Sequence, residues 1–290
     1  MNLKELLIGK GINPDQVLVL RHAPSEPDFK KVFPLLAADN PDLFNAYQQT
    51  QVEKLEKAMT TTGYVASFIA HGGGKALFVG LYKIGASRPL SHEQYWEVPA
   101  YIKMKTLGMK GFTGEKRSSI LWFDLTLTDF YASWKGKLII DWPPPERSWW
   151  RRAHRNEMPI HAILEDSALD AAMKKWDEIN FTWNQLNILP KRWQAILSEW
   201  RGIYFIFDKS DGKGYVGSAY GADNLLGRWR NYAASGHGGN RRLKQRDPEH
   251  FNFTILELVS PNMNADDVIR LEGSWKERLH TRQPHGLNEN

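Results

Sequence analysis

The chain has no cysteine and no long apolar run, and each absence excludes a class of protein. Without cysteine, its 290 residues form no disulfide framework and no metal site with thiolate ligands. No segment approaches the roughly 20 apolar residues that a membrane-spanning helix requires. Residues 1–16 also lack the long apolar core and the small-residue cleavage site of a signal peptide. We therefore expect a cytoplasmic protein that has no membrane partner.

The charge balance has a mild basic bias. The 38 lysines and arginines outnumber the 33 aspartates and glutamates, giving a formal charge of +5 and a pI near 9.2. This bias permits nucleic-acid binding but does not require it. Apolar residues make up 42% and charged residues 24%, which is ordinary for a globular protein. A chain of this length predicts about two domains.

The first 160 residues combine a few helical patterns with many short apolar runs. Helices are predicted at residues 1–9, 28–38 and 41–59. Strands are predicted at residues 16–20, 64–70, 76–84, 98–104, 119–127 and 137–141. This strand content favours a small, strongly bent sheet or a barrel of the PUA-like kind. We predict a mixed α+β chain with a β-rich domain and N-terminal helices at 1–160, a helical connector at 161–200 and a second domain at 201–290.

Tryptophan and arginine stand side by side in a short segment after the predicted strands. The segment contains Trp149, Trp150, Arg151 and Arg152. Indole rings stack on bases while guanidinium groups neutralise phosphates, so this pattern is typical of nucleic-acid binding. The alternative is a structural element whose tryptophans lie in the core and whose arginines are solvated. An aromatic pocket for a flipped base would suit the high tryptophan content.

The stretch from Gly202 to Tyr232 has the pattern of a β-hairpin followed by a helix. Apolar residues alternate along two short runs, and Asp211-Gly212 between them supplies the positive φ angles of a tight turn. A helical spacing follows. It puts Arg228 and Tyr232 on one helix face because they are four residues apart.

Several residues of this stretch and of the chain end form an ordered pattern. Gly-Ile-Tyr at 202–204 precedes Tyr-Val-Gly at 215–217, and the second tyrosine comes eleven residues after the first. The pattern continues with Arg228, Trp229, His237, Glu272 and Asn288. In this order the last ninety residues or so resemble the GIY-YIG nuclease superfamily. Tyr-Val-Gly-Ser-Ala followed by Arg-Trp is most similar to its phage-intron homing branch.

The resemblance implies a DNA endonuclease that hydrolyses phosphodiester bonds on a small antiparallel sheet flanked by helices. It implies that Tyr204 and Tyr215 line the pocket of the attacking water, that Arg228 holds the scissile phosphate, and that Tyr232 assists water activation. A phenol with an ordinary pKa near ~10 acts as a base only if a metal or another cation lowers that pKa. The residues alone leave open which tyrosine accepts the proton.

Glu272 is the metal ligand that the resemblance implies. On the helix predicted at 265–280 it lies at the edge of an apolar face with Val268 and Trp275 as neighbours. A carboxylate there is costly unless it is paired or binds a cation. We expect a single Mg²⁺ or Mn²⁺ ion, with an ion pair to Arg228 or Lys276 as the alternative.

The remaining residues of the expected site have weaker signals. His237 is expected to contact the phosphate or the water, or to be a surface loop residue. Asn288 is included in the catalytic set with a mainly structural role. Ser218 stands where several family members carry a lysine, and Lys213 is a candidate substitute for that lysine. The cations expected to bind the DNA backbone, or to form a solvated helix face, are Arg241, Arg242, Lys244 and Arg246.

The order of the two parts favours one kind of nuclease. Some two hundred residues precede the nuclease pattern, which continues to the last residue given. This order favours a restriction-type or modification-dependent endonuclease in which the N-terminal domain recognises the DNA. The alternatives are a structure-specific repair or recombination nuclease and a non-catalytic DNA-binding protein. Since one active site cuts one strand, we expect a homodimer on double-stranded DNA.

Overall fold

The computed structural model describes residues 1–170, 173–221, 224–235 and 242–289. They form two compact units, Met1–Ala171 and Ala172–Asn290. Each unit contains a mostly antiparallel sheet with helices, so the mixed α+β fold class is confirmed. Within these described residues, no helix combines the length and the apolar character needed to cross a membrane.

The first unit contains a seven-stranded sheet with six α-helices and three short 3₁₀ turns. Its helices are α1 (Leu3–Gly9), α2 (Pro27–Asp39), α3 (Pro41–Gln49), α4 (Glu53–Met59), α5 (His92–Glu97) and α6 (Pro99–Thr106). Its strands are β1 (Val17–His22), β2 (Tyr64–His71), β3 (Lys75–Ser91), β4 (Ser119–Leu127), β5 (Leu138–Asp141), β6 (Trp150–Arg152) and β7 (Ile160–Ile163). The 3₁₀ turns are η1 (Pro14–Gln16), η2 (Ala132–Trp134) and η3 (Ala153–Arg155).

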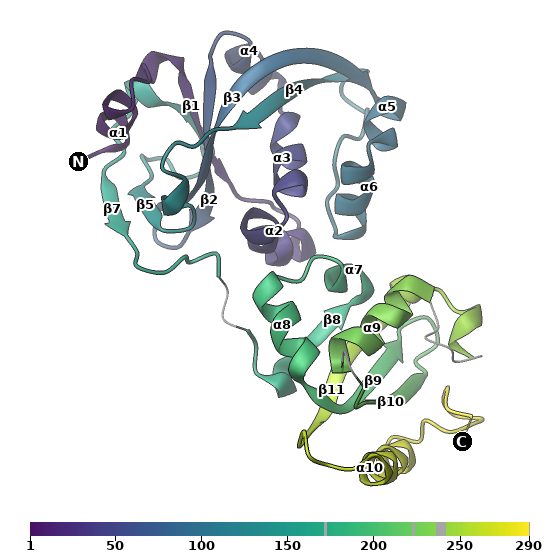
Figure 1. The fold of residues 1–290 in the computed structure, drawn as a ribbon. Coiled ribbons are helices and arrows are strands. Elements are labelled where there is room, and N and C mark those ends of the chain that lie inside the picture. The colour runs from purple at the N-terminus through teal and green to yellow at the C-terminus, as the bar shows by residue number, and fades with distance from the viewer. Residues whose placement is uncertain (171–172, 222–223, 236–241, 290) are drawn as a thin grey trace. The chain divides into compact units, whose positions relative to one another are not determined.

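The strands of the first unit pair in the order β6-β1-β2-β3-β5-β7, and β4 also pairs with β3. Only β1 and β2 are parallel. The β3–β4 register shifts between Ile84 and Ser87, and Figure 1 shows the long β3 curving with β4 towards α5. In the described residues the end strands β6 and β7 do not pair with each other, so the curled sheet stays open.

Both faces of the central strands are covered. Val17 and Val19 of β1 pack in a core cluster with residues of α1, and the residues between them on β1 point to the opposite face. There the His22 ring meets Phe33 and Phe44 of α2 and α3 edge-on. Figure 1 shows α1 and the α2–α3 pair on opposite sides of the sheet. Burial of all six residues of β1 follows from this double cover.

Two expectations for the first unit were wrong. Residues 98–104 form helix α6 instead of a strand, because Pro99 occupies its first turn, where the fixed φ of proline favours helix formation. The helix expected at 41–59 is interrupted between α3 and α4, where Thr50 makes an isolated bridge with Trp122. Thr50 therefore pairs with the neighbouring strand β4 instead of continuing the helix.

The second unit is a four-stranded antiparallel sheet with four α-helices and three 3₁₀ turns among the described residues. Its strands, in the order β10-β9-β11-β8, are β8 (Asn180–Thr182), β9 (Arg201–Asp208), β10 (Gly214–Ala219) and β11 (Phe251–Val259). Its helices are α7 (Trp183–Leu186), α8 (Lys191–Glu199), α9 (Asn224–Ser235) and α10 (Ala265–Arg278). The 3₁₀ turns are η4 (Trp176–Glu178), η5 (Leu243–Gln245) and η6 (Pro248–His250).

The stretch at 161–200, expected as a helical connector, contributes to both units. It supplies most of β7 to the first sheet and all of β8 to the second. Helices α7 and α8 follow β8, so the helical part of that expectation is limited to residues 183–199. The reason is pairing: Asn180, Phe181 and Thr182 complete the edge of the second sheet beside β11.

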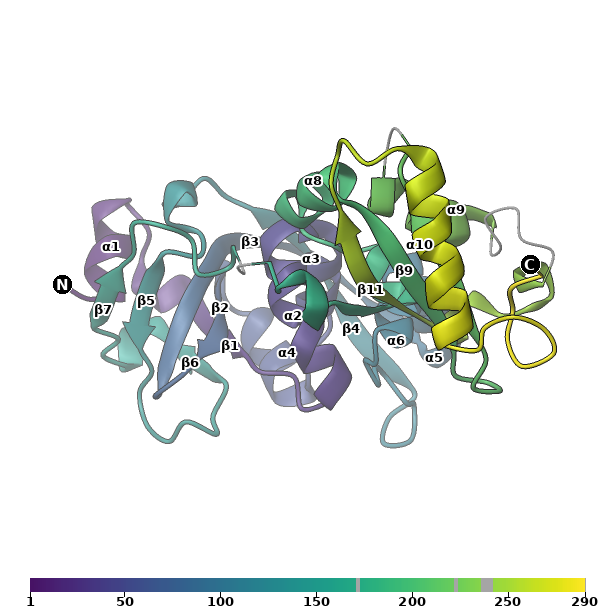
Figure 2. The same cartoon turned by 90° about the horizontal axis from the view of Figure 1, so that it is seen from below.

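The second sheet is covered by a helix on each face. Ile203 and Val216 pack against Val268 and Trp275 of α10, which Figure 2 shows running across the strands. Tyr204 faces the other way and packs edge-on against Trp229 of α9. This alternation of side chains is the two-residue period of a strand that is buried on both faces.

Candidate active site

Three tyrosines meet on the α9 face of the second sheet. Tyr204 comes from β9, Tyr215 from β10 and Tyr232 from α9. The hydroxyl oxygens of Tyr204 and Tyr232 lie 3.1 Å apart, and the Tyr215 and Tyr232 ring centroids lie 6.1 Å apart. Tyr204 is 0% exposed and Tyr232 1%, whereas Tyr215 is 9% exposed. Of the three phenols, that of Tyr215 is therefore the most accessible to a substrate.

Glycine at 217 is required by this packing. In the β9–β10 register Gly217 lies opposite Tyr204. A Cβ added to Gly217 would lie 2.5 Å from the Tyr204 hydroxyl oxygen, closer than a carbon atom tolerates. The glycine of the second motif thus makes room for the tyrosine of the first motif.

Arg228 extends from α9 towards the same tyrosines. Leu225, Leu226 and Trp229 anchor the helix in the core and leave the Arg228 side chain half-buried. Tyr204 raises the pKa of Arg228 further above its already high ordinary value. Its Nε atom is buried and has no hydrogen-bond partner within the described part of the chain. An unpaired, permanently charged donor beside phenols is suited to bind an anion.

Burial keeps two of the phenols protonated. It raises the pKa of Tyr204, with a further increase from Tyr215, and the Arg228 cation offsets only part of that rise. Burial raises the pKa of Tyr232 as well. Both side chains are therefore neutral at pH 7, and act as hydrogen-bonding groups in this state of the site.

Glu272 lies at the other face of β10. Its helix begins after Asn264, whose side chain accepts a hydrogen bond of 2.9 Å from the Asp267 backbone and caps the first turn. The Ser218 hydroxyl donates to one carboxylate oxygen of Glu272, and Lys276 Nζ lies 2.7 Å from the other. Of the two ion pairs considered from the sequence, the structure thus contains the one with Lys276.

The edge of β10 separates the two halves of the site. Ser218 comes three residues after Tyr215, so their side chains leave the strand on opposite faces. Tyr215 joins the tyrosine cluster on one face, and Ser218 joins Glu272 on the other. Both halves therefore lie at the end strand of the sheet, one on each of its faces.

Asn288 fixes part of this edge. Its amide oxygen accepts a 3.0 Å hydrogen bond from the Val216 N–H, and its amide nitrogen donates a 2.8 Å bond to the Val216 carbonyl. The Leu287 N–H donates to the Gly214 carbonyl at 2.9 Å. A side-chain amide at 3% exposure thus replaces a neighbouring strand, which agrees with the mainly structural role expected for Asn288.

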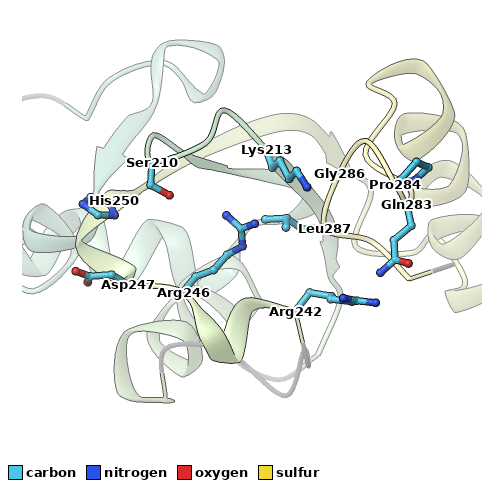
Figure 3. Close-up of a pocket in the computed structure, with 10 residues that line it drawn as sticks. All are labelled: Ser210, Lys213, Arg242, Arg246, Asp247, His250, Gln283, Pro284, Gly286 and Leu287. Atoms are coloured by element: carbon cyan, nitrogen blue, oxygen red, sulfur yellow. The ribbon is translucent and has the colours of Figure 1, made fainter.

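A basic pocket lies in the same unit. It has a volume of about 590 Å³ and includes Lys213 and Arg242, which Figure 3 shows beside Arg246 at the same hollow. Arg246 forms ion pairs of 2.6 Å with Asp208 and 2.8 Å with Asp211. These pairs hold Arg246 in the wall of the pocket. Lys244 is exposed, and the predicted residues Arg241 and His237 lie outside the described residues.

The tryptophan-arginine segment separates into different roles. Trp149 lines a cavity of the first unit, and Trp150 and Arg152 are half-buried residues of β6. Arg151 donates to Ser148 Oγ and to the Pro143 and Pro145 carbonyls, so its guanidinium ties its own loop together.

Sequence reasoning did not find the other residues that line this cavity of the first unit. Among them are His22, Tyr47, Tyr95 and Phe112. They come from distant parts of the chain and form no local motif. The one signal present in the sequence is Trp149.

Residues 201–285 match the family model described as the GIY-YIG catalytic domain. The second unit contains a GIY-YIG catalytic domain. The match supports an endonuclease activity, the hydrolysis of phosphodiester bonds, for this unit.

Two solved structures are similar to part of this chain. The chain is similar to a structure of the catalytic domain of the homing endonuclease I-TevI, with 26% identity, a TM-score of 0.26, and coverage of 31% of this chain and 98% of that one. A mutant of the catalytic domain of the intron endonuclease I-TevI gives 24% identity, a TM-score of 0.27, and coverage of 31% and 94%. No curated protein matches.

Proposed function

We propose that this chain is a metal-dependent endonuclease of the restriction or modification-dependent type, which cuts double-stranded DNA and recognises it through its first unit. The observation that carries the proposal is the unpaired Arg228 Nε beside three tyrosines, with Glu272 across the β10 edge. A cation for the phosphate, phenols for the water and a carboxylate for a metal are the groups that phosphodiester hydrolysis requires.

Arg228 is the residue that binds the scissile phosphate in this proposal. A planar guanidinium donates two parallel hydrogen bonds to phosphate oxygens and keeps its charge at any physiological pH. Tyr215, as the most exposed phenol, is the one that touches the attacking water. The hydroxyl oxygens of Tyr204 and Tyr232 lie 3.1 Å apart, deeper in the site than Tyr215. In this proposal they orient the Tyr215 phenol and supply hydrogen bonds.

Glu272 would hold the divalent ion, Mg²⁺ or Mn²⁺. Within the described residues no three histidine, aspartate or glutamate side chains gather into a metal site. A hard ion that keeps several waters needs only one or two carboxylates together with a substrate phosphate, so Glu272 fits this ion. The ion would stabilise the charge on the phosphate and make the water more acidic. Lys276 holds Glu272 in place by an ion pair of 2.7 Å.

The first unit provides the specificity in this proposal. The catalytic residues occupy the second unit, and some 170 residues with a separate core precede it. That unit contains the aromatic cavity to which Trp149 contributes. Cleavage of both strands requires two active sites or two sequential cuts, and a homodimer on DNA satisfies the first option.

The test is cleavage of one plasmid prepared in two forms, one unmodified and one carrying 5-methylcytosine or 5-hydroxymethylcytosine, with Mg²⁺. Discrete fragments from the modified form alone would identify a modification-dependent enzyme, and fragments from the unmodified form an ordinary restriction enzyme. Glu272→Ala should abolish cutting. Glu277→Ala is the matched control, because Glu277 lies on the same helix but pairs with Arg282 at 2.9 Å.

Two results would contradict the proposal. Cutting of branched DNA in preference to both plasmid forms would indicate a structure-specific nuclease. DNA binding without cutting in Mg²⁺ or Mn²⁺ would indicate a protein that has lost catalysis.

A further inference from the structure

The first unit contains a cavity of about 770 Å³ at the C-terminal end of β1. Its walls include four aromatic rings that come from α3, α5 and two loops: Tyr47, Tyr95, Phe112 and Trp149. Tyr95 and Phe112 lie with ring centroids 5.8 Å apart in an edge-on arrangement. A volume in this range is typical of small-molecule sites, and an aromatic wall favours a flat ligand.

His22 also lines the cavity, and one of its ring nitrogens is a buried polar atom without a partner. Its side chain is 3% exposed, and its Nε2 has no hydrogen-bond partner within the described residues. Burial lowers the pKa of His22 to about 4, so the ring is neutral at pH 7. In a neutral imidazole one nitrogen donates and the other accepts, so Nε2 is able to take either role in a hydrogen bond.

A buried polar atom without a partner costs free energy. A ligand group that hydrogen-bonds to His22 Nε2 would remove that cost. A flat heterocycle with hydrogen-bonding groups at its edge would pack among the aromatic rings and supply that bond. A purely apolar ligand would leave Nε2 without a partner.

Two kinds of cation line the cavity. Arg21 and Arg117 are engaged, the first 3.7 Å from Glu146 and the second 2.7 Å from the buried Glu56. Lys116 and Arg147 are exposed and have no hydrogen-bond or ion-pair partner in the part of the chain that the structure describes. Free cations beside an aromatic cavity match a ligand with a flat base and a phosphate.

We propose that this cavity binds one nucleotide of DNA, with its base among the aromatic rings and His22 and its phosphate at Lys116 and Arg147. The inference rests on the proposed function, because it makes this cavity the reading site of the first unit. A base can reach such a cavity only when it leaves the duplex stack, so the proposal also implies base flipping or a single-stranded target.

The first experiment titrates the full chain with five probes by calorimetry: dCMP, 5-methyl-dCMP, 5-hydroxymethyl-dCMP, dAMP and inorganic phosphate. At least one nucleotide should bind, and should bind more tightly than phosphate. Trp149→Ala should weaken that binding about tenfold, because it removes a ring on which the base would stack. Trp134→Ala is the matched control, because Trp134 is also half-buried in this unit but stacks on Tyr131 outside the cavity.

A second pair of variants keeps the test informative if Trp149→Ala does not fold. Lys116→Ala and Arg147→Ala change exposed side chains that make no hydrogen bond or ion pair with the described residues. They should weaken nucleotide binding severalfold without affecting binding of the corresponding nucleoside. Two results would overturn the proposal. One is that phosphate binds as tightly as every nucleotide. The other is that neither Trp149→Ala nor Lys116→Ala changes the affinity for nucleotides.

DNA probes distinguish the source of the nucleotide. A 12-mer single strand and the matching duplex should compete with the bound mononucleotide if the cavity reads DNA. Competition by mononucleotides alone would make the cavity a site for a free nucleotide and would contradict the reading role. If the chain cuts DNA but binds no nucleotide here, the inference fails while the proposed nuclease stands. If it binds nucleotide and DNA but cuts neither plasmid form, the proposed function fails and the cavity assignment stands.

Discussion

Two pockets of this protein, one in each unit, differ in the chemistry of their walls. The pocket of the first unit, about 770 Å³, is lined by the rings of Tyr47, Tyr95, Phe112 and Trp149 as well as by cations. The pocket of the second unit, about 590 Å³, has Lys213, Arg242 and Arg246 in its wall, and no tyrosine, tryptophan or phenylalanine among its described lining residues. Each unit thus offers a different surface to a polynucleotide.

This contrast corresponds to the two parts of a nucleotide. Phosphates bind through charge, which carries no sequence information and weakens with salt. Bases bind through stacking and hydrogen bonds, which can distinguish one base from another. The basic pocket is therefore expected to position the DNA backbone in the catalytic unit, and the aromatic cavity to select a base. Variants that affect one unit and spare the other test this division.

The largest effect is expected from Arg228→Ala, which should lower the cleavage rate by about 10³-fold. Removing a preorganised charge from the site of the scissile phosphate removes stabilisation of the transition state. Nucleotide binding in the first unit should not change. Single-turnover cleavage and calorimetry measure the two quantities. Arg230→Ala is the control, since Arg230 lies on the same helix but donates to Gln194; equal loss in both variants would contradict the role of Arg228.

The next effect concerns stability and should be confined to the second unit. Arg246→Met leaves the buried Asp208 carboxylate, 1% exposed, without its 2.6 Å partner, and should lower the free energy of unfolding by about 3 kcal/mol. Hydrogen exchange with peptide resolution separates the second unit from the first. Arg270→Met, which removes an exposed pair with Asp267, should change stability by less than about 1 kcal/mol.

The same ion pair gives a pH dependence with a defined sign. Burial alone would raise the pKa of Asp208, but hydrogen bonds from Ser210 and Arg246 outweigh it and hold the pKa below its ordinary value of 3.8. A carboxyl group whose folded pKa is depressed stabilises the fold above its unfolded pKa, and this contribution is lost as the pH falls below it. The stability difference between wild type and Arg246→Met should therefore shrink below about pH 4. A constant difference down to pH 2 would exclude this cause.

Tyr215→Phe should lower the cleavage rate about 100-fold, and Tyr204→Phe about tenfold. In this proposal the Tyr215 hydroxyl acts directly on the attacking water, so its loss should lower the rate more. The Tyr204 hydroxyl contributes one hydrogen bond within the tyrosine cluster, so its loss should lower the rate less. The pH profile of the rate distinguishes a chemical role from a structural one, since only Tyr215→Phe should alter its shape. The reverse order of the two effects would assign the water to Tyr204.

That the candidate site residues lie together could be predicted from the sequence, because the main ones are close together along the chain. Tyr204, Tyr215 and Arg228 lie in one hairpin and the helix after it, and the strand register brings them together. The spacing also offered Lys276, four residues after Glu272 on the same helix, and the structure contains that ion pair. The structure adds what spacing could not give: the Ser218 hydroxyl of β10 donates to Glu272. That contact depends on how α10 packs on the sheet.

The first unit was less predictable for the opposite reason. Its cavity draws His22, Tyr47, Tyr95, Phe112 and Trp149 from five separate segments. The tryptophan content suited an aromatic pocket. No local pattern, however, distinguishes Trp149, which lines the cavity, from Trp150, which belongs to strand β6. The strand predicted at 98–104 was wrong because a short apolar run fits a strand or a helix equally well. Only the proline near the start of this run favours the helix that the structure contains.

The smallest effect tests the contrast between the two pockets most directly. Lys213→Ala should weaken DNA binding severalfold and reduce the slope of log affinity against log salt by about 1, because one phosphate contact is lost. Trp149→Ala should weaken binding of the recognised DNA and leave that slope unchanged, because stacking releases no counterions. Lys209→Ala, an exposed lysine of the same turn, is the control. If Lys213→Ala left the slope intact while Trp149→Ala reduced it, the backbone would contact the aromatic cavity, and the assignment of phosphate and base to the two pockets would have to be reversed.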